Sequence, residues 1–448
     1  MVMRQKAVTE LAREVLIPSL IEERERQQTF ENWARGKHEK PYRPREATRE
    51  YDALLEKSRT PFIGLVLKML CQSIELRDYS PSNEALKDDL WAVWRGNRMP
   101  VRQSRLYRAA FQGGLAYSML LPGEPVPEAK IYSAKRMLAV YQDPEADEWP
   151  EFAVYMEPST AKASHYLVLD HEAVYRFGYD RVEGKLEYIE HQEHNLGVTP
   201  VVRYAGEMDD EGTVTGEVEP LIPVQASVDQ SKFDLLMTET FASWKIRYIT
   251  GMAAPDSEED QKRQKMILER DRLLLIENPD AKAGALDSTD MKQYIEARRD
   301  AKQDLASIAQ VPQKALLGAQ ANQSDGAEAQ AAEEASMQRK LHDYETSFGE
   351  SHQQWFRLAG LSQGNLEAWT DYEGSCDFRD ASIRSMSQMA DALGKIAVQL
   401  QVPVRALWHM IPNVDSGTVK SWEKLADADP YGRMLRNVDL GQFDDQAV

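Results

Sequence analysis

The spacing of apolar and polar positions along the chain predicts a fold that is α+β and mainly helical. Helical periodicity covers residues 1–35, 51–78 and 83–118. From Ala116 to about Tyr204 the pattern changes to short apolar runs separated by Pro, Gly and Asp-rich turns. Such runs at short spacing are typical of antiparallel strands.

The apolar positions of the first helices indicate the faces that are buried. In residues 1–35 one face is marked by Val8, Leu11, Val15, Leu16 and Leu20, and we expect Pro18 to interrupt the helix. In residues 51–78 the core stripe is predicted to be Phe62, Leu65, Val66, Met69 and Ile74. We interpret Trp91 and Trp94 as core residues.

Two long helices follow the predicted sheet. The first spans Pro220–Tyr248, is apolar on several sides and therefore needs more than one neighbour. Its predicted wet face is marked by Asp229, Lys232 and Asp234. The second runs from Asp287 to Val311, where Pro312 ends it. Its predicted capping residues are Asp287, Ser288 and Thr289, and its apolar positions are Met291, Tyr294, Ile295, Leu305 and Ile308.

A polar loop, Gln313–Asp325, separates the second helix from another long one. It holds Gly318 and several amide side chains, but Lys314 is its single basic residue. Ser324 or Asp325 can cap the following helix, which has no proline for roughly 30 residues. After it, residues 362–380 predict a return strand, and residues 381–448 are helical again with Ser416 as a cap.

Charge and cysteine content narrow the function classes. The 448-residue chain has a formal net charge of −19, which argues against tight gripping of DNA phosphates. It does not exclude a conduit for DNA, where strong attraction would act as friction. Two cysteines without a paired motif favour a reducing compartment. We expect no signal peptide and no membrane-spanning segment.

No motif for catalysis or cofactor binding is found. The chain lacks a P-loop and the common hydrolase, metalloprotease and kinase signatures. His165, His171, His191 and His194 are interpreted as strand or turn residues, since a metal needs convergent ligands. The acids Asp209–Glu211 are interpreted as a solvated loop. The prediction is therefore no catalytic, cofactor or metal site.

The order of these pieces resembles a known family. The sequence runs from a long helix through IAQVP, KALLG and a short polar loop to SDGAEA and a long helix ending FGESHQQWFRLAG. This order resembles the portal (head-to-tail connector) proteins of tailed bacteriophages, and in particular the Gp6-like portals and the branch found in phages of actinobacteria. The stretch WRGN, followed by a helix and GGLAY, resembles a stretch of portal wings, in which such a helix leads through a glycine turn into a strand.

The resemblance implies a portal fold with seven segments. A wing of helices and antiparallel sheet covers 1–219 and a first stem helix 220–250. A small α/β clip covers 251–286, a second stem helix 287–311 and a tunnel loop 312–325. The wing spine helix and return strand cover 326–380, and a helical crown 381–448. The clip is expected to pair strands between subunits.

The resemblance also implies a ring of about twelve copies around double-stranded DNA that is not read for sequence. The tunnel-loop residues expected at the channel are Gln313, Lys314, Gly318, Gln320, Asn322, Gln323 and Ser324. The basic residues expected to face it are Lys232, Lys245, Arg247, Lys292, Arg298, Arg299 and Lys302. Pairing of Lys232, Lys245 and Arg247 with acids of a neighbouring chain is an equal alternative.

The implied partners are those of a portal vertex. They are further copies of the chain, the terminase large subunit, a head-tail adaptor, and the major capsid and scaffolding proteins, with no membrane. The implied location is the virion, after assembly in the host cytoplasm. Two alternatives stay open: a nuclease-like enzyme using Asp209–Glu211, and another head-tail connector ring.

Overall fold

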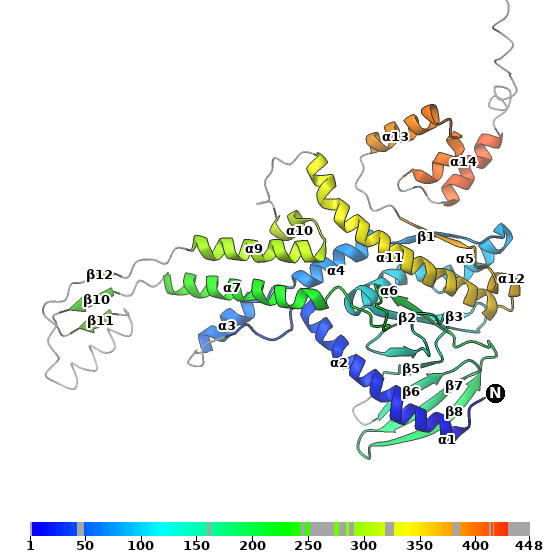
Figure 1. The fold of residues 1–448 in the computed structure, drawn as a ribbon, viewed down its shortest axis with the longest axis horizontal. Coiled ribbons are helices and arrows are strands. Elements are labelled where there is room, and N and C mark those ends of the chain that lie inside the picture. The colour runs from blue at the N-terminus through cyan, green and yellow to red at the C-terminus, as the bar shows by residue number, and fades with distance from the viewer. Residues whose placement is uncertain are drawn as a thin grey trace, which may run out of the picture. The chain divides into compact units, whose positions relative to one another are not determined.

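A computed structural model gives the fold (Figure 1). It describes residues 2–42, 49–158, 163–242, 247–250, 273–276, 284–285, 291–318, 327–379, 386–411, 414 and 416–428. The chain divides into two compact units. The first comprises Met1–Leu70, Arg105–Met119 and Lys130–Lys340, and the second comprises Cys71–Ser104, Leu120–Ala129 and Leu341–Val448.

The first helix of the chain is continuous but contains one wide turn. α1 (Gln5–Leu11) passes through a π-helical turn (Ala12–Leu16) into α2 (Ile17–Ala34). The prediction that Pro18 interrupts the helix is only partly right: the helix continues through Pro18, but the π turn that comes just before it breaks the regular α-helical hydrogen bonding. Val15, placed on the buried face by regular spacing, is 46% exposed because the π turn shifts the helical phase.

The predicted antiparallel sheet is present. Its five strands are β4 (Met137–Val140), β5 (Phe152–Met156), β6 (Ala163–Leu169), β7 (Ala173–Asp180) and β8 (Lys185–Glu193), in that order. Alternate residues such as Val154, Val168 and Phe177 pack in one apolar cluster with Leu16 and Leu20. The α1–α2 segment therefore covers one face of this sheet (Figure 1).

A second, three-stranded sheet follows α6 (Met99–Gly113). It consists of β2 (Leu115–Leu121), β3 (Glu128–Ser133) and β9 (Val201–Ala205), in the order β3-β2-β9. Gly114 joins helix to strand with φ of +85°, and a Cβ there would lie 2.8 Å from Val214 Cγ1. The predicted glycine turn into a strand is confirmed at this point, and Tyr117 is buried beyond it.

Two long helices of the first unit lie side by side. α7 (Ile222–Ala242), which follows a short 3₁₀ turn at Glu219–Leu221, packs antiparallel to α9 (Lys292–Ala309) (Figure 1). α3 (Arg49–Ser58) packs on α7, and α4 (Phe62–Ser73) follows α3. The predicted helix to Tyr248 is too long, because Arg247–Thr250 is a strand, β10.

A small sheet is formed by the segment between these helices. β10 pairs parallel with β11 (Leu273–Ile276) and antiparallel with β12 (Gly284–Ala285). β11 and β12 lie within the small α/β segment expected at 251–286. Arg247–Thr250 is a strand because it pairs with β11 and β12, which are distant in sequence. The helical periodicity of the sequence gives no sign of this pairing, so the helix predicted from it was too long.

The connection after α9 contains a short helix. Gln310 ends α9 in the left-handed region, and Pro312 precedes α10 (Gln313–Leu317). The predicted loop from Gln313 is therefore wrong in its first residues, because a proline that ends one helix also suits the start of another. The long helix after the loop is confirmed as α11 (Ala327–Ser362). Its predicted caps, Ser324 and Asp325, lie outside the described residues, as do Asp287–Thr289 before α9.

The second unit is organised around α11 and a two-stranded sheet. β1 (Leu76–Ser80) pairs antiparallel with β13 (Ser375–Phe378), which confirms the return strand and corrects the helix predicted to residue 78. Its other elements are a 3₁₀ turn (Glu84–Leu86), α5 (Lys87–Gly96), α12 (Leu366–Trp369), α13 (Met386–Gln399), a 3₁₀ segment (Val404–Met410) and α14 (Ser416–Ala428).

Aromatic packing forms the core of this unit. Trp94 is fully buried, and its ring lies edge-on to Trp355 with centroids 5.1 Å apart. Tyr79 of β1 stacks on Phe356 of α11 at 4.1 Å. The core role predicted for Trp94 is confirmed, whereas Trp91 is half-buried at the edge of the cluster. Across the described residues, no helix is both long and apolar enough to cross a membrane.

Candidate functional site

Three of the predicted basic residues converge between α7 and α9. Lys232 of α7 donates a hydrogen bond from Nζ to Thr60 Oγ1 at 3.2 Å. Lys302 of α9 donates from Nζ to the Leu316 carbonyl at 3.4 Å and lies 4.9 Å from the centre of the Phe62 ring. Arg298 lies beside them on α9, and all three side chains are half-buried.

The pKa values of all three cations are lowered by burial, and those of Lys232 and Lys302 also by neighbouring positive charge. Burial lowers the pKa of Lys232, and the nearby Arg298 charge lowers it further. Burial, Arg298 and Lys232 lower the pKa of Lys302 in the same way. Burial also lowers the pKa of the Arg298 guanidinium, against the favourable charge of Asp229, and its buried Nε has no hydrogen-bond partner among the described residues.

Asp229 is the buried carboxylate at the centre of this region. Its Oδ2 lies 2.7 Å from His38 Nε2, and its Oδ1 accepts hydrogen bonds from the Thr60 backbone N–H and from Gln225 Nε2. Asp229 is only 1% exposed, so its assignment to a wet helix face is wrong. Donors from two other segments of chain satisfy the carboxylate, which makes its burial tolerable.

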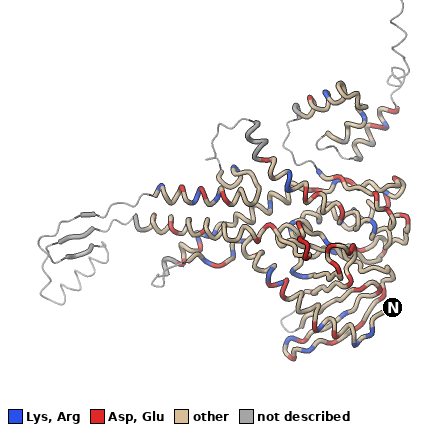
Figure 2. Tube along the Cα trace, in the orientation of Figure 1, with Lys and Arg blue, Asp and Glu red and all other residues tan. Residues whose placement is uncertain are grey.

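The remaining predicted residues are more scattered. Lys292 and Arg299 are exposed on α9, where Figure 2 shows basic and acidic residues interleaved. Gln313 and Lys314 are half-buried in α10, and exposed Gly318 ends it with φ of +72°. The predicted residues outside the described chain are Lys245, Gln320, Asn322, Gln323 and Ser324, together with the side chain of Arg247.

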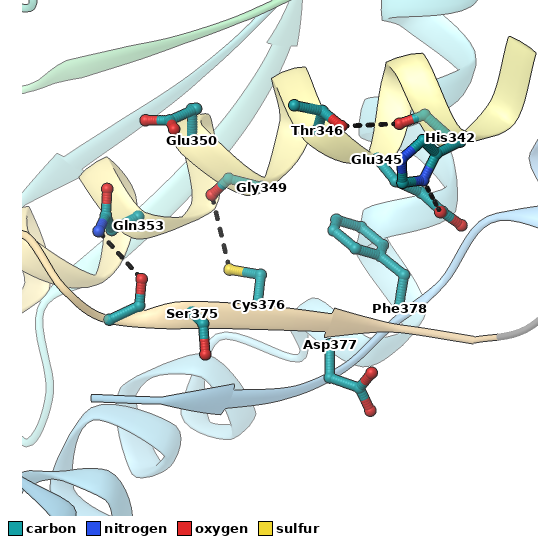
Figure 3. Close-up of a pocket in the computed structure, with 11 residues that line it drawn as sticks. His342, Glu345, Thr346, Gly349, Glu350, Gln353, Ser375, Cys376, Asp377 and Phe378 are labelled. Atoms are coloured by element: carbon teal, nitrogen blue, oxygen red, sulfur yellow. Dashed lines mark hydrogen bonds and ion pairs between the residues drawn. The ribbon is translucent and has the colours of Figure 1, made fainter. Parts of the chain in front are cut away.

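A cavity of about 440 Å³ lies between α11 and β13 in the second unit (Figure 3). It brings Cys376 and His342 to one groove, but Cys376 donates its S–H to the Gly349 carbonyl at 3.5 Å. Burial and the charges of Glu350 and Asp377 raise the pKa of the Cys376 thiol to about 12. The thiol therefore stays protonated at neutral pH and is a poor nucleophile.

The acidic loop at Asp209–Glu211 is a structured turn. Asp209 Oδ1 accepts hydrogen bonds from the backbone N–H groups of Glu211 and Thr213, and a bridge between Met208 and Val214 closes the turn. Asp209 is thereby occupied in capping its own loop. In the described part of the chain, no group of three His, Cys, Asp or Glu residues is placed to hold a metal ion.

Sequence reasoning did not find the pairing of His38 with Asp229. Their separation of 191 positions leaves no local pattern to detect. One usable signal was present: an acid within a helix that is apolar on several sides must either face water or meet a buried donor. His38, whose ring stacks on Trp33 at 3.9 Å, is that donor in the connector before α3.

Comparison with known proteins gives one family assignment. The family model described as "Phage portal protein, SPP1 Gp6-like" matches residues 14–429. Among curated proteins, no match is found. Among solved structures, a chain from the "Neck of native GTA particle computed with C12 symmetry" is similar, with 14% identity and a TM-score of 0.46. That similarity covers 81% of this chain and 91% of the other. Because the family match spans nearly the whole sequence, the chain belongs to the SPP1 Gp6-like family of phage portal proteins.

Proposed function

We propose that about twelve copies of this chain form a closed ring at one vertex of a phage capsid, with double-stranded DNA passing through its centre. The family membership carries this proposal. The described order of elements supports it, because the antiparallel pair α7–α9 leads through α10 and residues 319–326 into the 36-residue helix α11. In this proposal α7 and α9 are the stem helices of the wall.

Apolar residues left on the surface of α9 support a contact with another copy. Met291, Ile295 and Ile308 are 38%, 54% and 47% exposed in the single chain. Ile295 and Ile308 belong to α9, which already packs on α7, and Met291 is the residue just before its first turn. Apolar side chains on a further part of its surface suit a neighbouring stem helix, since burial there recovers the hydrophobic stabilisation that a lone subunit lacks.

The proposed contact with DNA is sparse. Lys292 and Arg299 are exposed on α9 and are the stronger candidates for reaching phosphate. Lys232, Arg298 and Lys302 are weaker candidates, because all three are half-buried and burial lowers their pKa values. Lys232 and Lys302 also donate hydrogen bonds within the chain. A few cations per subunit, repeated around a ring, give a salt-dependent and sequence-blind attraction that still permits sliding.

The segment formed by α10 and the residues after it is proposed as the tunnel loop that rings the narrowest point. The residues assigned to it are Gln313, Lys314, Gly318, Gln320, Asn322, Gln323 and Ser324. Amide and small side chains contact a passing duplex without strong attraction. The β10–β12 region is proposed as the clip, which would dock the terminase large subunit during packaging and a head-tail adaptor afterwards. Capsid and scaffolding proteins would contact the outer part of the ring.

Deleting Ala319–Gln323 tests the proposal. We expect the shortened chain to form particles of the wild-type mass, about 0.6 MDa by light scattering, because α9 and α11 stay intact. Packaging or retention of DNA in assembled phage should fall. The matched control deletes the exposed turn residues Val182–Gly184 of the β7–β8 hairpin. Normal packaging by the Ala319–Gln323 deletion would refute the role of the loop.

A further inference from the structure

A second concentration of basic residues lies in a concave pocket of the first unit. The pocket, of about 410 Å³, is formed by α2, α6, the turn before β4 and the end of β5. Its six cationic residues are Arg24, Arg35, Arg105, Arg108, Lys135 and Arg136. None of them belongs to the stem helices.

Acids within the pocket neutralise only part of this charge. Glu31 pairs with both Arg35 and Lys135, at 2.7 and 2.5 Å. Glu157, the other acid, pairs with Arg176, which lies outside the pocket, at 3.1 Å. The exposed Arg105 and Arg108 of α6 have no ionic partner among the described residues. The pocket therefore carries an excess of positive charge in a hollow, which favours an anionic occupant.

The Asp209–Glu211 turn provides the complementary charge on another side of the same unit. Glu207, Asp209, Asp210 and Glu211 are exposed and form no ion pair within the described chain. The turn is closed by the Met208–Val214 bridge, so its acidic side chains are held on a defined loop.

α2 separates the acidic turn from the basic pocket. Arg24 and Glu31 of α2 line the pocket, whereas Arg26 donates from Nη2 to the Val214 carbonyl at 3.3 Å. At 3.6 residues per turn, Arg26 lies roughly 160° around the helix from Arg24 and roughly 140° from Glu31. The turn and the pocket thus lie on opposite sides of α2 and are not placed to meet within one chain.

We propose that the acidic turn Glu207–Glu211 of one copy docks into the basic pocket of the next copy. Two different, complementary surfaces on opposite sides of a subunit are what a head-to-tail ring interface requires. This inference rests on the proposed ring and assigns a specific contact within it. Asp210 and Glu211 are the side chains that reach the partner, because Asp209 caps its own turn.

Charge reversal tests the contact through the mass of the assembly. We expect R105E/R108E and D210K/E211K each to shift the full-length chain from rings to smaller particles, raising the half-assembly concentration about tenfold. An equimolar mixture of the two variants should regain rings, since each altered surface then meets its complement. The chain with all four substitutions should regain them as well. K6E/R13E, which makes the same change in charge on the first helix, should assemble like wild type.

The outcomes separate this contact from the ring itself. A wild-type chain that stays monomeric would refute both proposals. Wild-type rings that tolerate R105E/R108E, or variants that neither mixture nor combination restores, would refute only the docking contact. A short fluorescent DNA duplex tests the competing occupant. If R105E/R108E rings form normally but bind the duplex more weakly by anisotropy, the pocket holds phosphate and the inference is wrong.

Discussion

At the residue scale, hydrogen-bond partners decide which polar groups the interior of the fold tolerates. Asp229 keeps its place inside the fold because His38, Thr60 and Gln225 offer it hydrogen-bond donors. Arg298 lacks such a partner at Nε among the described residues and has its pKa lowered. A buried charged group is stable where hydrogen bonds satisfy it, as at Asp229. Where they do not, as at Arg298, burial makes the charged form less favourable.

His352 makes the stability of the second unit depend on pH. Its ring is fully buried against Trp94, and burial lowers its pKa to about 3, against roughly 6.5 in an unfolded chain. Below pH 6.5 the unfolded chain therefore binds a proton that the folded chain does not. We expect the free energy of unfolding to fall by roughly 1 kcal/mol per pH unit between pH 6.5 and 4.

Thermal unfolding at pH 7.5, 6.0 and 4.5 checks this dependence. H352Q should remove much of the difference between these pH values, although it lowers stability at pH 7.5. H342Q is the matched control on the same helix, because the His342 side chain is 79% exposed. An H352Q chain with an unchanged pH profile would show that other groups cause the acid sensitivity.

At the element scale, contacts between distant segments set the ends of the helices. The described part of α7 reaches Ala242 and β10 begins at Arg247, although the apolar pattern continues through both. By contrast, α6 stops at Gly113 because Gly114 takes a positive φ and turns the chain into β2. The first boundary depends on strand partners, and the second on the glycine itself.

Replacing Gly114 by alanine measures how closely Val214 approaches the turn between α6 and β2. Gly114 and Gly197 both have positive φ, of +85° and +73°, but a Cβ at Gly197 meets nothing within 4 Å. G197A should therefore cost about 1 kcal/mol from φ strain alone. G114A should cost about 2 kcal/mol more, since its methyl group would press on Val214. Equal losses in urea unfolding would mean that the neighbouring loop moves away freely.

At the scale of the whole molecule, the chain has surfaces that suit other copies of itself. Apolar residues of α9 such as Ile295 are exposed in a single chain. The basic pocket and the acidic turn also keep charged side chains, such as Arg105 and Asp210, that form no ion pair among the described residues. A formal charge of −19 opposes non-specific association, so complementary patches of this kind favour a defined ring over aggregation.

Ile295 tests the apolar contact between stem helices. It is 54% exposed, so I295D should change the thermal midpoint of the subunit little. In a ring the same carboxylate would be buried against a neighbour, and we expect the 0.6 MDa particle to dissociate at low micromolar concentration. V182D, at a residue 80% exposed in the β7–β8 turn, is the control. Intact I295D rings would place this face of α9 outside the interface.

The sequence by itself determined the features that depend on local pattern. Short apolar runs separated by turn residues in Ala116–Tyr204 predicted the antiparallel strands, and the absence of proline after Ala327 predicted α11. The order of IAQVP, KALLG and the two long helices identified the family that the match over residues 14–429 bears out. These signals lie within single elements or in the order of the elements along the chain. The amino-acid sequence alone is therefore sufficient to detect them.

Only the tertiary structure decided the features that join distant residues. The burial of Asp229 depends on His38, 191 residues away, and β1 depends on β13 nearly 300 residues later. Similarly, Arg24, Arg105 and Lys135 form one pocket although nothing in the sequence links them. Such groupings come from the packing of whole elements, which the local spacing of apolar residues does not encode.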